Sequence, residues 1–280
     1  MELTVIGATG SFPGPTSPAS CYLLQDRDRE GKTWNVVLDL GSGSLGTLQQ
    51  HLELEDLDAV LLTHLHPDHC LDVCGLYVTR KFSPRRTDSD PAGSGSVREL
   101  AGQRLPIYGP PGTELRLGNA YYTDPGAALQ PGETADPSKL GDVFTFTDWQ
   151  NARERQIGPF TVRPILVEHP VEAYALRITG PSGEVLTYSG DTDDCPGIVE
   201  AARAADLFLC EAAFHEGRDA VRGIHLTGVR AGAVAAAAQV RRLVLTHIPP
   251  WNDPAVTERE ATTAYSGPTE LAEHGKTYSL

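Results

Sequence analysis

Short apolar segments, each ending at a glycine turn or a polar residue, recur along this chain of 280 residues, and this pattern most limits the fold. Such runs predict buried strands, and longer segments with an apolar face predict helices. The predicted strands span residues 3–7, 21–25, 35–41, 58–63, 105–110, 160–169, 173–179, 184–191, 206–212 and 242–247, and the predicted helices span residues 45–52, 71–82, 198–205 and 227–240. This mixture predicts an α/β fold in which helices sandwich two sheets.

The chain shows no short tandem repeat and no clear domain boundary. A hydrophobic content of 40% is enough for a substantial core. Residues 83–104 and 124–141 are rich in proline and glycine, and we interpret the first of these segments as an exposed loop rather than a linker. We therefore expect one domain over residues 1–280.

The charge balance bears on the class of partner. The chain has 37 acidic and 23 basic residues, which gives a formal net charge of -14. Such a surface repels nucleic-acid backbones, and the longest basic cluster, KFSPRR at residues 81–86, is weak, so a large RNA is a disfavoured partner. No apolar run approaches the roughly 18 residues that span a bilayer, so we expect no membrane partner.

The cysteines bear on cellular location. Their number is odd and their positions, Cys21, Cys70, Cys74, Cys195 and Cys210, are scattered, which favours reduced thiols in the cytoplasm. A strand-like segment follows Met1 at once, so we expect no signal peptide. Cys70 and Cys74 are four residues apart, but no second cysteine pair completes a zinc finger, and we interpret them as buried residues on one helix face.

The segment HLHPDH at residues 64–69 carries four metal-ligand side chains in one loop. His64 and His66 are two residues apart, so in an extended stretch they point the same way. Pro67 ends that stretch, and Asp68 and His69 lie beyond it. The loop can therefore offer two ligands to one metal and two to a neighbouring metal, and the remaining ligands must come from elsewhere in the chain.

Three further strand ends supply such ligands. His169, Asp191 and His247 each close a predicted apolar strand, where side chains converge at one sheet edge. A lone histidine in such a place usually makes a structural hydrogen bond, but the whole set favours a site with two metals about 3.5–4 Å apart, bridged by a carboxylate such as Asp191. Seven nitrogen and oxygen ligands leave positions open for water, which favours catalysis over a structural role. Zinc suits this set first, with manganese or iron as the alternatives.

These motifs together resemble the metallo-β-lactamase superfamily, in the expected order along essentially the whole chain. The resemblance rests on HLHPDH, His169, SGDT at residues 189–192 and LTH at residues 245–247. It implies an αββα sandwich with a dinuclear metal site at one sheet edge. It also implies one metal held by His64, His66 and His169, a second held by Asp68, His69 and His247, and Asp191 as the bridge.

Two more stretches resemble loops of ribonuclease Z and its phosphodiesterase relatives. They are GIHLTG at residues 223–228 and LFLCEAAF at residues 207–214, and the residues carried over are His225 and Glu211. His225 would bind a phosphate oxygen or protonate the leaving group, Glu211 would orient it, and Asp68 would both ligate a metal and accept a proton from water. The alternative interpretations are a loop histidine that precedes a helix, and a charge at a strand end.

The substrate prediction rests on a further resemblance. GPTSPASCYLL (14–24), VVLDLGSGSLGTLQ (36–49) and LTHIPPW (245–251) resemble the actinobacterial branch of small ribonuclease-Z-like proteins with cyclic nucleotide phosphodiesterase activity. Ribonuclease Z holds tRNA with a basic arm, and we find no long segment of that kind here. The predicted substrate is a small cyclic nucleotide, 3′,5′-cAMP first, with Trp251 and Tyr174 as candidates to stack on the base.

Three rival functions stay open. The first is a tRNA 3′-end endonuclease of the ribonuclease Z type, and the second is a hydrolase of esters, lactones or lactams, which would not need His225 and Glu211. The third is a metal- or nucleotide-binding regulator without catalysis. The resemblance also implies a homodimer.

Overall fold

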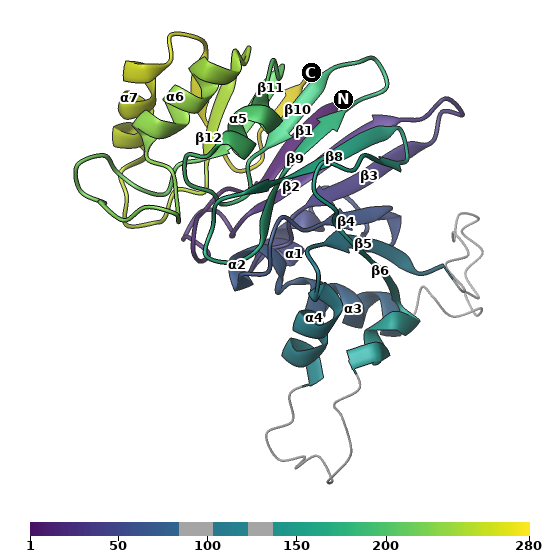
Figure 1. The fold of residues 1–280 in the computed structure, drawn as a ribbon. Coiled ribbons are helices and arrows are strands. Elements are labelled where there is room, and N and C mark those ends of the chain that lie inside the picture. The colour runs from purple at the N-terminus through teal and green to yellow at the C-terminus, as the bar shows by residue number, and fades with distance from the viewer. Residues whose placement is uncertain (84–102, 123–136) are drawn as a thin grey trace.

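The computed structural model describes residues 1–83, 103–122 and 137–280, so most of the two predicted proline- and glycine-rich loops lies outside the described residues. Two seven-stranded sheets form the centre of the molecule (Figure 1). The first has the order β14-β1-β2-β3-β4-β5-β6, and the second has the order β13-β12-β11-β10-β9-β8-β7. The strands are β1 (Glu2–Gly7), β2 (Cys21–Arg27), β3 (Thr33–Leu38), β4 (Ala59–Leu61), β5 (Leu105–Gly109), β6 (Phe144–Asp148), β7 (Arg155–Ile157), β8 (Phe160–Val167), β9 (Ala173–Thr179), β10 (Val185–Tyr188), β11 (Leu207–Glu211), β12 (Leu243–Thr246), β13 (Thr269–Leu271) and β14 (Thr277–Ser279).

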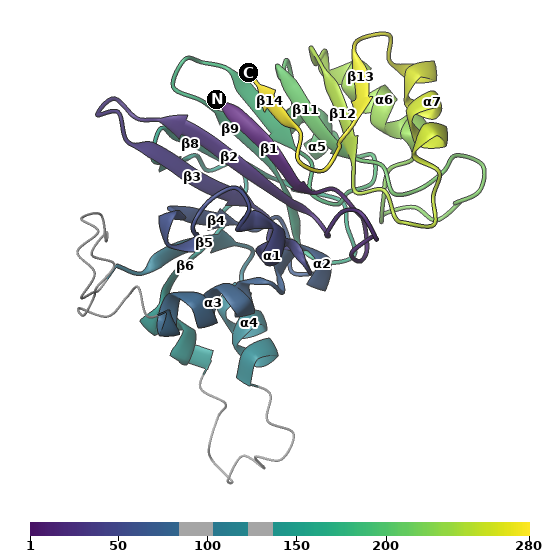
Figure 2. The same cartoon turned by 180° about the vertical axis from the view of Figure 1, so that it is seen from behind.

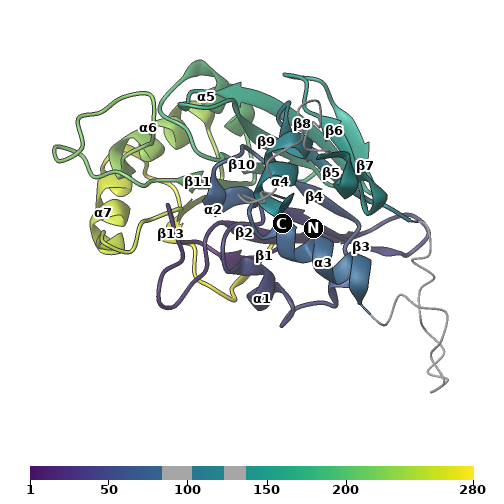
Figure 3. The ribbon, with the colours of Figure 1, turned by 90° about the horizontal axis from the view of Figure 1, so that it is seen from below.

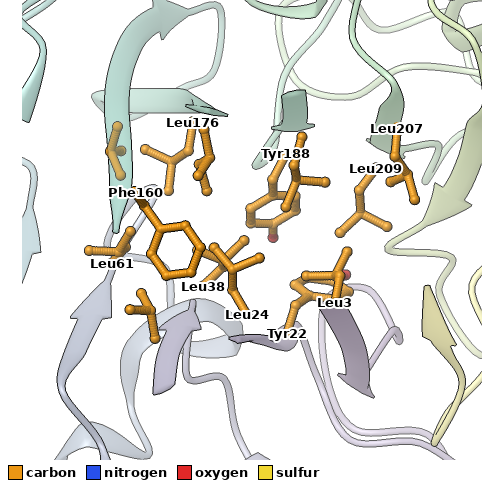
Figure 4. Close-up of a cluster of buried hydrophobic side chains, with 14 of the residues drawn as sticks. Leu3, Tyr22, Leu24, Leu38, Leu61, Phe160, Leu176, Tyr188, Leu207 and Leu209 are labelled. Carbon is orange, nitrogen blue, oxygen red and sulfur yellow. The ribbon is translucent and has the colours of Figure 1, made fainter. Parts of the chain in front are cut away.

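Strand alternation divides the side chains between two sides of each sheet. In β2, Tyr22 and Leu24 face the second sheet, whereas Cys21 and Leu23 face the helices. This period of two is what a strand buried on both faces requires. Figure 4 shows the layer between the sheets, where leucines and aromatic rings from both sheets meet.

Helices cover the outer face of each sheet, as the views from behind and from below show (Figures 2 and 3). The apolar sides of α1, α3 and α4 pack on the first sheet, and those of α5, α6 and α7 pack on the second. The helices are α1 (Ser44–Leu48), α2 (Pro67–Cys70), α3 (Val73–Phe82), α4 (Thr113–Tyr122), α5 (Pro196–Ala202), α6 (Gly228–Ala238) and α7 (Pro254–Ala264), with short 3₁₀ turns at Leu54–Asp56 and Pro137–Asp142. The predicted αββα sandwich is confirmed.

Several predicted boundaries need correction. The strand expected over residues 58–63 ends at Leu61, and the helix expected over residues 45–52 ends at Leu48. Pro67 does not merely end a strand, because it occupies the first turn of α2, where its missing N–H leaves no donor unpaired. None of the helices within the described ranges is long and apolar enough to cross a membrane.

Candidate metal centre

The predicted ligands lie at one edge of the sandwich because the strands that precede them run in the same direction. Within the second sheet, β8, β10, β11 and β12 are mutually parallel in direction, so their carboxyl ends share an edge. His169, Asp191 and His247 follow β8, β10 and β12 at that edge. The loop after β4 and the helix α2 bring the ligands of the HLHPDH segment to the same edge from the first sheet (Figure 1).

The turns that follow β3, β10 and β12 adopt an unusual backbone. Asp39, Gly190 and His247 all have positive φ, at 53°, 56° and 56°. For residues with a side chain this region costs of order 1–3 kcal/mol, and such residues cluster at functional sites. Gly10 permits the turn at His247, because a Cβ on Gly10 would lie 2.3 Å from the His247 carbonyl oxygen. The fold therefore keeps two strained polar residues at the site edge.

The first group of ligand atoms comes from His64, His66, His169 and Asp191, all within 4.8 Å of one another. Nε2 of His64 and Nε2 of His169 each lie 3.1 Å from Nδ1 of His66. In a tetrahedral zinc site with bonds of about 2.05 Å, ligand nitrogens are about 3.3 Å apart. The three imidazoles therefore already have nearly the separation that one small cation requires.

The second group comes from Asp68, His69, Asp191 and His247. Nε2 of His69 lies 3.2 Å from Oδ1 of Asp191, and Nε2 of His247 lies 3.3 Å from its Oδ2. Oδ2 of Asp68 lies 3.5 Å from Nε2 of His69 and 3.8 Å from Nε2 of His247. Asp191 belongs to both groups, which is the position of a bridging carboxylate.

Three buried atoms in this cluster lack a hydrogen-bond partner within the part of the chain that the structure describes. They are Nε2 of His69, Oδ1 of Asp191 and Nε2 of His247. Leaving a buried polar atom unpaired costs about 1–3 kcal/mol or more. Because all three atoms point into the second group, a cation there would satisfy them together. The residues present thus fit a pair of divalent metal ions.

Hydrogen bonds fix the other ring nitrogen of four histidines. Nδ1 of His69 lies 2.7 Å from the Asp39 carboxylate, and Nδ1 of His169 lies 2.8 Å from the Ile224 carbonyl oxygen. The hydroxyl oxygens of Thr63 and Ser20 lie 3.1 Å and 3.0 Å from Nδ1 of His64 and His247, respectively. Because the Asp39 carboxylate and the Ile224 carbonyl can only accept, the proton of His69 and of His169 stays on Nδ1 and leaves Nε2 free to ligate.

Burial sets the charge of most of these groups. Desolvation lowers the pKa of His64, His66, His169 and His247, which favours the neutral imidazoles that metals need. Desolvation alone would raise the pKa of Asp191, but the surrounding histidines hold it well below its usual range. Desolvation also acts to lower the pKa of His69, and the carboxylates of Asp191 and Asp39 outweigh it and raise that pKa. A cation would therefore compete with a proton for His69.

His225 and Glu211 form a pair beside the second group. Nδ1 of His225 lies 2.8 Å from Oε1 of Glu211 and 4.0 Å from Oδ2 of Asp191. Glu211 is fully buried, and the backbone N–H groups of Thr192 and Ala213 donate to its carboxylate at 2.9 and 3.0 Å. Desolvation acts to lower the pKa of His225, but the Glu211 carboxylate outweighs it and raises the pKa to about 9.

The structure brings together all nine residues predicted for the site, in the groupings that the resemblance implies. Tyr174 is a correction, because it is buried in the layer between the sheets and cannot stack on a base. Trp251 is 60% exposed and lies against Phe12, with ring centroids 5.4 Å apart. Cys70 and Cys74 join none of the candidate ligand groups within the described ranges, and all five cysteines are free thiols.

Asp39 orients the candidate ligand His69, and the sequence reasoning missed it. It is buried, and its carboxylate accepts hydrogen bonds from the backbone and hydroxyl of Thr63 at 2.7 and 2.8 Å and from the Tyr188 hydroxyl at 2.8 Å, in addition to His69. It follows the apolar strand β3 directly. The same signal that selected His247, a polar residue directly after a buried strand, would have found it.

The fold and the site define a class of protein. A family model described as the beta-lactamase superfamily domain matches residues 35–248, and the chain belongs to this superfamily. It has a metallo-hydrolase fold with His/Asp clusters capable of binding metal ions.

Among individual relatives, the chain is 43% identical over 282 residues to the uncharacterized protein ML1173 of Mycobacterium leprae, covering 100% of this chain and 89% of that one. It is 29% identical over 277 residues to the probable metallo-hydrolase YhfI of Bacillus subtilis, covering 98% of each chain. The crystal structure of YhfI superposes on this chain with a TM-score of 0.76, covering 99% of this chain and 98% of that one. It is also 28% identical over 293 residues to the ribonuclease Z of Methanosarcina acetivorans, covering 89% of this chain and 87% of that one.

Proposed function

We propose that this protein is a dinuclear metal phosphodiesterase that hydrolyses small cyclic nucleotides, with 3′,5′-cAMP as its preferred substrate. The observation that carries the proposal is the His225–Glu211 pair, because a protonated imidazole beside a candidate two-metal site suits an ester with a poor alkoxide leaving group. Hydrolysis of an activated ester or lactone would not need it.

Two divalent cations, held by the two ligand groups, would spread the charge of the phosphate and lower the pKa of water near it. The protein's own side chains would carry out the two proton transfers. Asp68 would accept a proton from the attacking water, and His225 would donate a proton to the ester oxygen as its bond to phosphorus breaks. The products are a phosphate monoester and a free hydroxyl group, so one water molecule is consumed.

Glu211 would keep His225 in its acid form and in one orientation. Its carboxylate is held by two backbone N–H groups, so it cannot turn away from Nδ1 of His225. A fixed carboxylate beside an imidazole sets both its tautomer and its charge. Both properties are required for proton donation through Nε2.

Two observations favour a small nucleotide over RNA. The net charge of -14 repels a long phosphate backbone. The exposed rings of Phe12 and Trp251 offer an aromatic face. Both rings lie on segments close to His247, because the backbone N–H of Gly10, two residues before Phe12, donates to the carbonyl of Ile248, which follows His247. A single base can stack on such a face.

A tRNA 3′-end endonuclease is the second candidate, favoured by the similarity to a ribonuclease Z. A hydrolysis assay separates the candidates. Purified protein with added zinc or manganese would be offered 3′,5′-cAMP, 2′,3′-cAMP, a precursor tRNA with a 3′ trailer and a lactone, with a chelator control and the Asp191→Asn variant. Faster turnover of 3′,5′-cAMP supports the proposal, whereas trailer cleavage or lactone opening without cAMP turnover would overturn it.

A further inference from the structure

The segment that carries His225 has little regular structure of its own. Between Phe214 and Thr227 the chain forms no helix or strand, so most backbone polar groups there need partners from elsewhere. Gly223 has a φ of 77°, which adds a sharp turn two residues before His225. The position of the imidazole therefore depends on contacts that reach this loop from the rest of the fold.

Asp193 supplies such contacts at the start of the turn. It is 1% exposed, and its Oδ2 accepts hydrogen bonds from the backbone N–H of Gly223 and from Nε of Arg222, both at 2.7 Å. Its Oδ1 accepts from the Arg230 guanidinium, at the first turn of α6, and from the backbone N–H of Asp194. One buried carboxylate thus bonds to residues on either side of His225 in the chain, at positions 222, 223 and 230.

The next two residues are held by the candidate metal site itself. The Ile224 carbonyl accepts a hydrogen bond from Nδ1 of His169, and His225 bonds to Glu211. Asp193 lies two residues after Asp191, and its backbone N–H donates to the Glu168 carbonyl, next to His169. The carboxylate therefore joins the turn that bears the candidate bridging ligand to the loop that bears the candidate acid.

We propose that Asp193 is a positioning residue that holds the His225 imidazole in register with the two-metal site. Its carboxylate bonds to residues 194, 222, 223 and 230 rather than to the predicted ligand atoms, so it would act through the loop of residues 222–225. This inference rests on the proposed function, because it concerns the proton donor of that reaction. Small displacements of a catalytic group cost large factors in rate, whereas substrate binding at the metals changes little.

The test is a double-mutant cycle with Asp193→Asn and His225→Ala on the phosphodiester that the native protein turns over. Asp193→Asn keeps the shape of the side chain and removes its charge. We expect a loss in kcat of about 10²-fold with KM little changed and the metal content unchanged. In the His225→Ala background, the same substitution should cost less than about 3-fold, because the group that it positions is already absent.

Asp194→Asn is the matched control, since it removes the same charge from an exposed neighbour and should leave kcat unchanged. Arg222→Gln is a milder variant that removes one donor from Asp193 and, with 60% of its side chain exposed, should fold normally. We expect it to give a smaller loss in the same direction. Equal losses from Asp193→Asn in both backgrounds, or no loss, would overturn the inference.

Hydrogen exchange separates this inference from the proposed function. In Asp193→Asn, the amides of residues 222–226 should exchange faster than in the native protein, while those of Asp194→Asn should not change. Native protein without phosphodiesterase activity would refute the proposed function alone. Unchanged exchange in Asp193→Asn would refute the positioning role, whatever the native protein hydrolyses.

Discussion

His225 shares with His69 an Nδ1 that bonds to a buried carboxylate, Glu211 in one case and Asp39 in the other. Nδ1 of His64, His169 and His247 lies beside a neutral oxygen, whereas His66 turns its Nδ1 into the cluster. His225 lies outside the two ligand groups but beside them, because it forms a third cluster with Asp191 and Glu211. This place beside the two groups supports the proposed role of a proton donor.

His225→Ala should therefore lose turnover without losing metal. We expect kcat to fall by about 10²–10⁴-fold, the usual contribution of one general acid. The measurement is steady-state kinetics on the preferred phosphodiester, together with metal analysis. His51→Ala, at an exposed site, should behave like the native protein. A rate within about 3-fold of the native value would remove His225 from the proposed reaction.

Glu211→Gln should shift the pH profile. A raised pKa means that the acid form of His225 is present below that pKa and is lost as pH rises through about 9. Nearby dications would lower this value, so the descending limb in the metal-loaded protein lies below pH 9. Without the Glu211 charge the limb should move to still lower pH. Profiles of kcat that coincide for the two proteins would contradict the assigned role of Glu211.

Trp251→Ala should weaken substrate binding more than it slows the reaction. Stacking of one base on an aromatic ring contributes about 1–3 kcal/mol, so KM for cAMP should rise by roughly 5- to 150-fold. Phe82→Ala removes another exposed ring, 63% exposed at the end of α3, and serves as the control. An unchanged KM would show that the base lies elsewhere.

At the level of elements, long periodic segments were predictable and short edge elements were not. The helix expected over residues 227–240 is α6, Gly228–Ala238, and the strand over residues 173–179 is β9 with the same bounds. The strands β13 and β14 have three residues each and exist through pairing with β12 and β1, which a local pattern cannot show. The helices α4 and α7 are more polar than the alanine-rich α6, and the sequence analysis predicted neither of them.

In the candidate site too, residues with a local sequence signal were predictable, and residues whose role depends on distant contacts were not. Its ligands were predictable because each lies just beyond a buried strand or within one dense motif. Ser20 was not, because its role depends on a contact 227 residues away along the chain. Asp193 was missed for the same reason, since Gly223 lies 30 residues further on. The long-range contacts of Ser20 and Asp193 are visible only once the chain is folded.

Thr227 anchors the start of α6, the helix that follows His225. It is the N-cap of α6, and its hydroxyl oxygen accepts a hydrogen bond from the backbone N–H of Arg230. Loss of such a cap costs about 1 kcal/mol, up to about 2. Thr227→Ala should lower the free energy of unfolding by that amount in denaturant titration. The exposed helical Thr262→Ala should change it by less than about 0.5 kcal/mol, and equal effects would contradict the cap.

At the scale of the whole molecule, the candidate metal centre joins the two sheets. His64, His66, Asp68 and His69 come from the side of the first sheet, and His169, Asp191 and His247 come from the second. Bound metals would therefore cross-link the sandwich at one edge. The apolar layer between the sheets is independent of them, so the metal-free protein should remain folded.

Metal removal should lower thermal stability by mass action. A ligand at about 1,000 times its Kd stabilises by about 4 kcal/mol. Calorimetry with and without a chelator should show a lower Tm for the metal-free protein and full recovery on adding zinc or manganese. Asp191→Asn, which removes the shared carboxylate, should show little dependence of Tm on metal. A native Tm insensitive to metal would argue against a site that links the sheets.

The central claim is that two metal ions at this edge support hydrolysis of a cyclic phosphodiester. The most direct measurement is a titration of metal-free protein with zinc or manganese, in which bound metal and cAMP hydrolysis are followed in the same samples. The account predicts no turnover without metal and a rate that rises until two ions are bound per chain. Turnover in the metal-free protein, or two bound ions without cAMP hydrolysis, would contradict it.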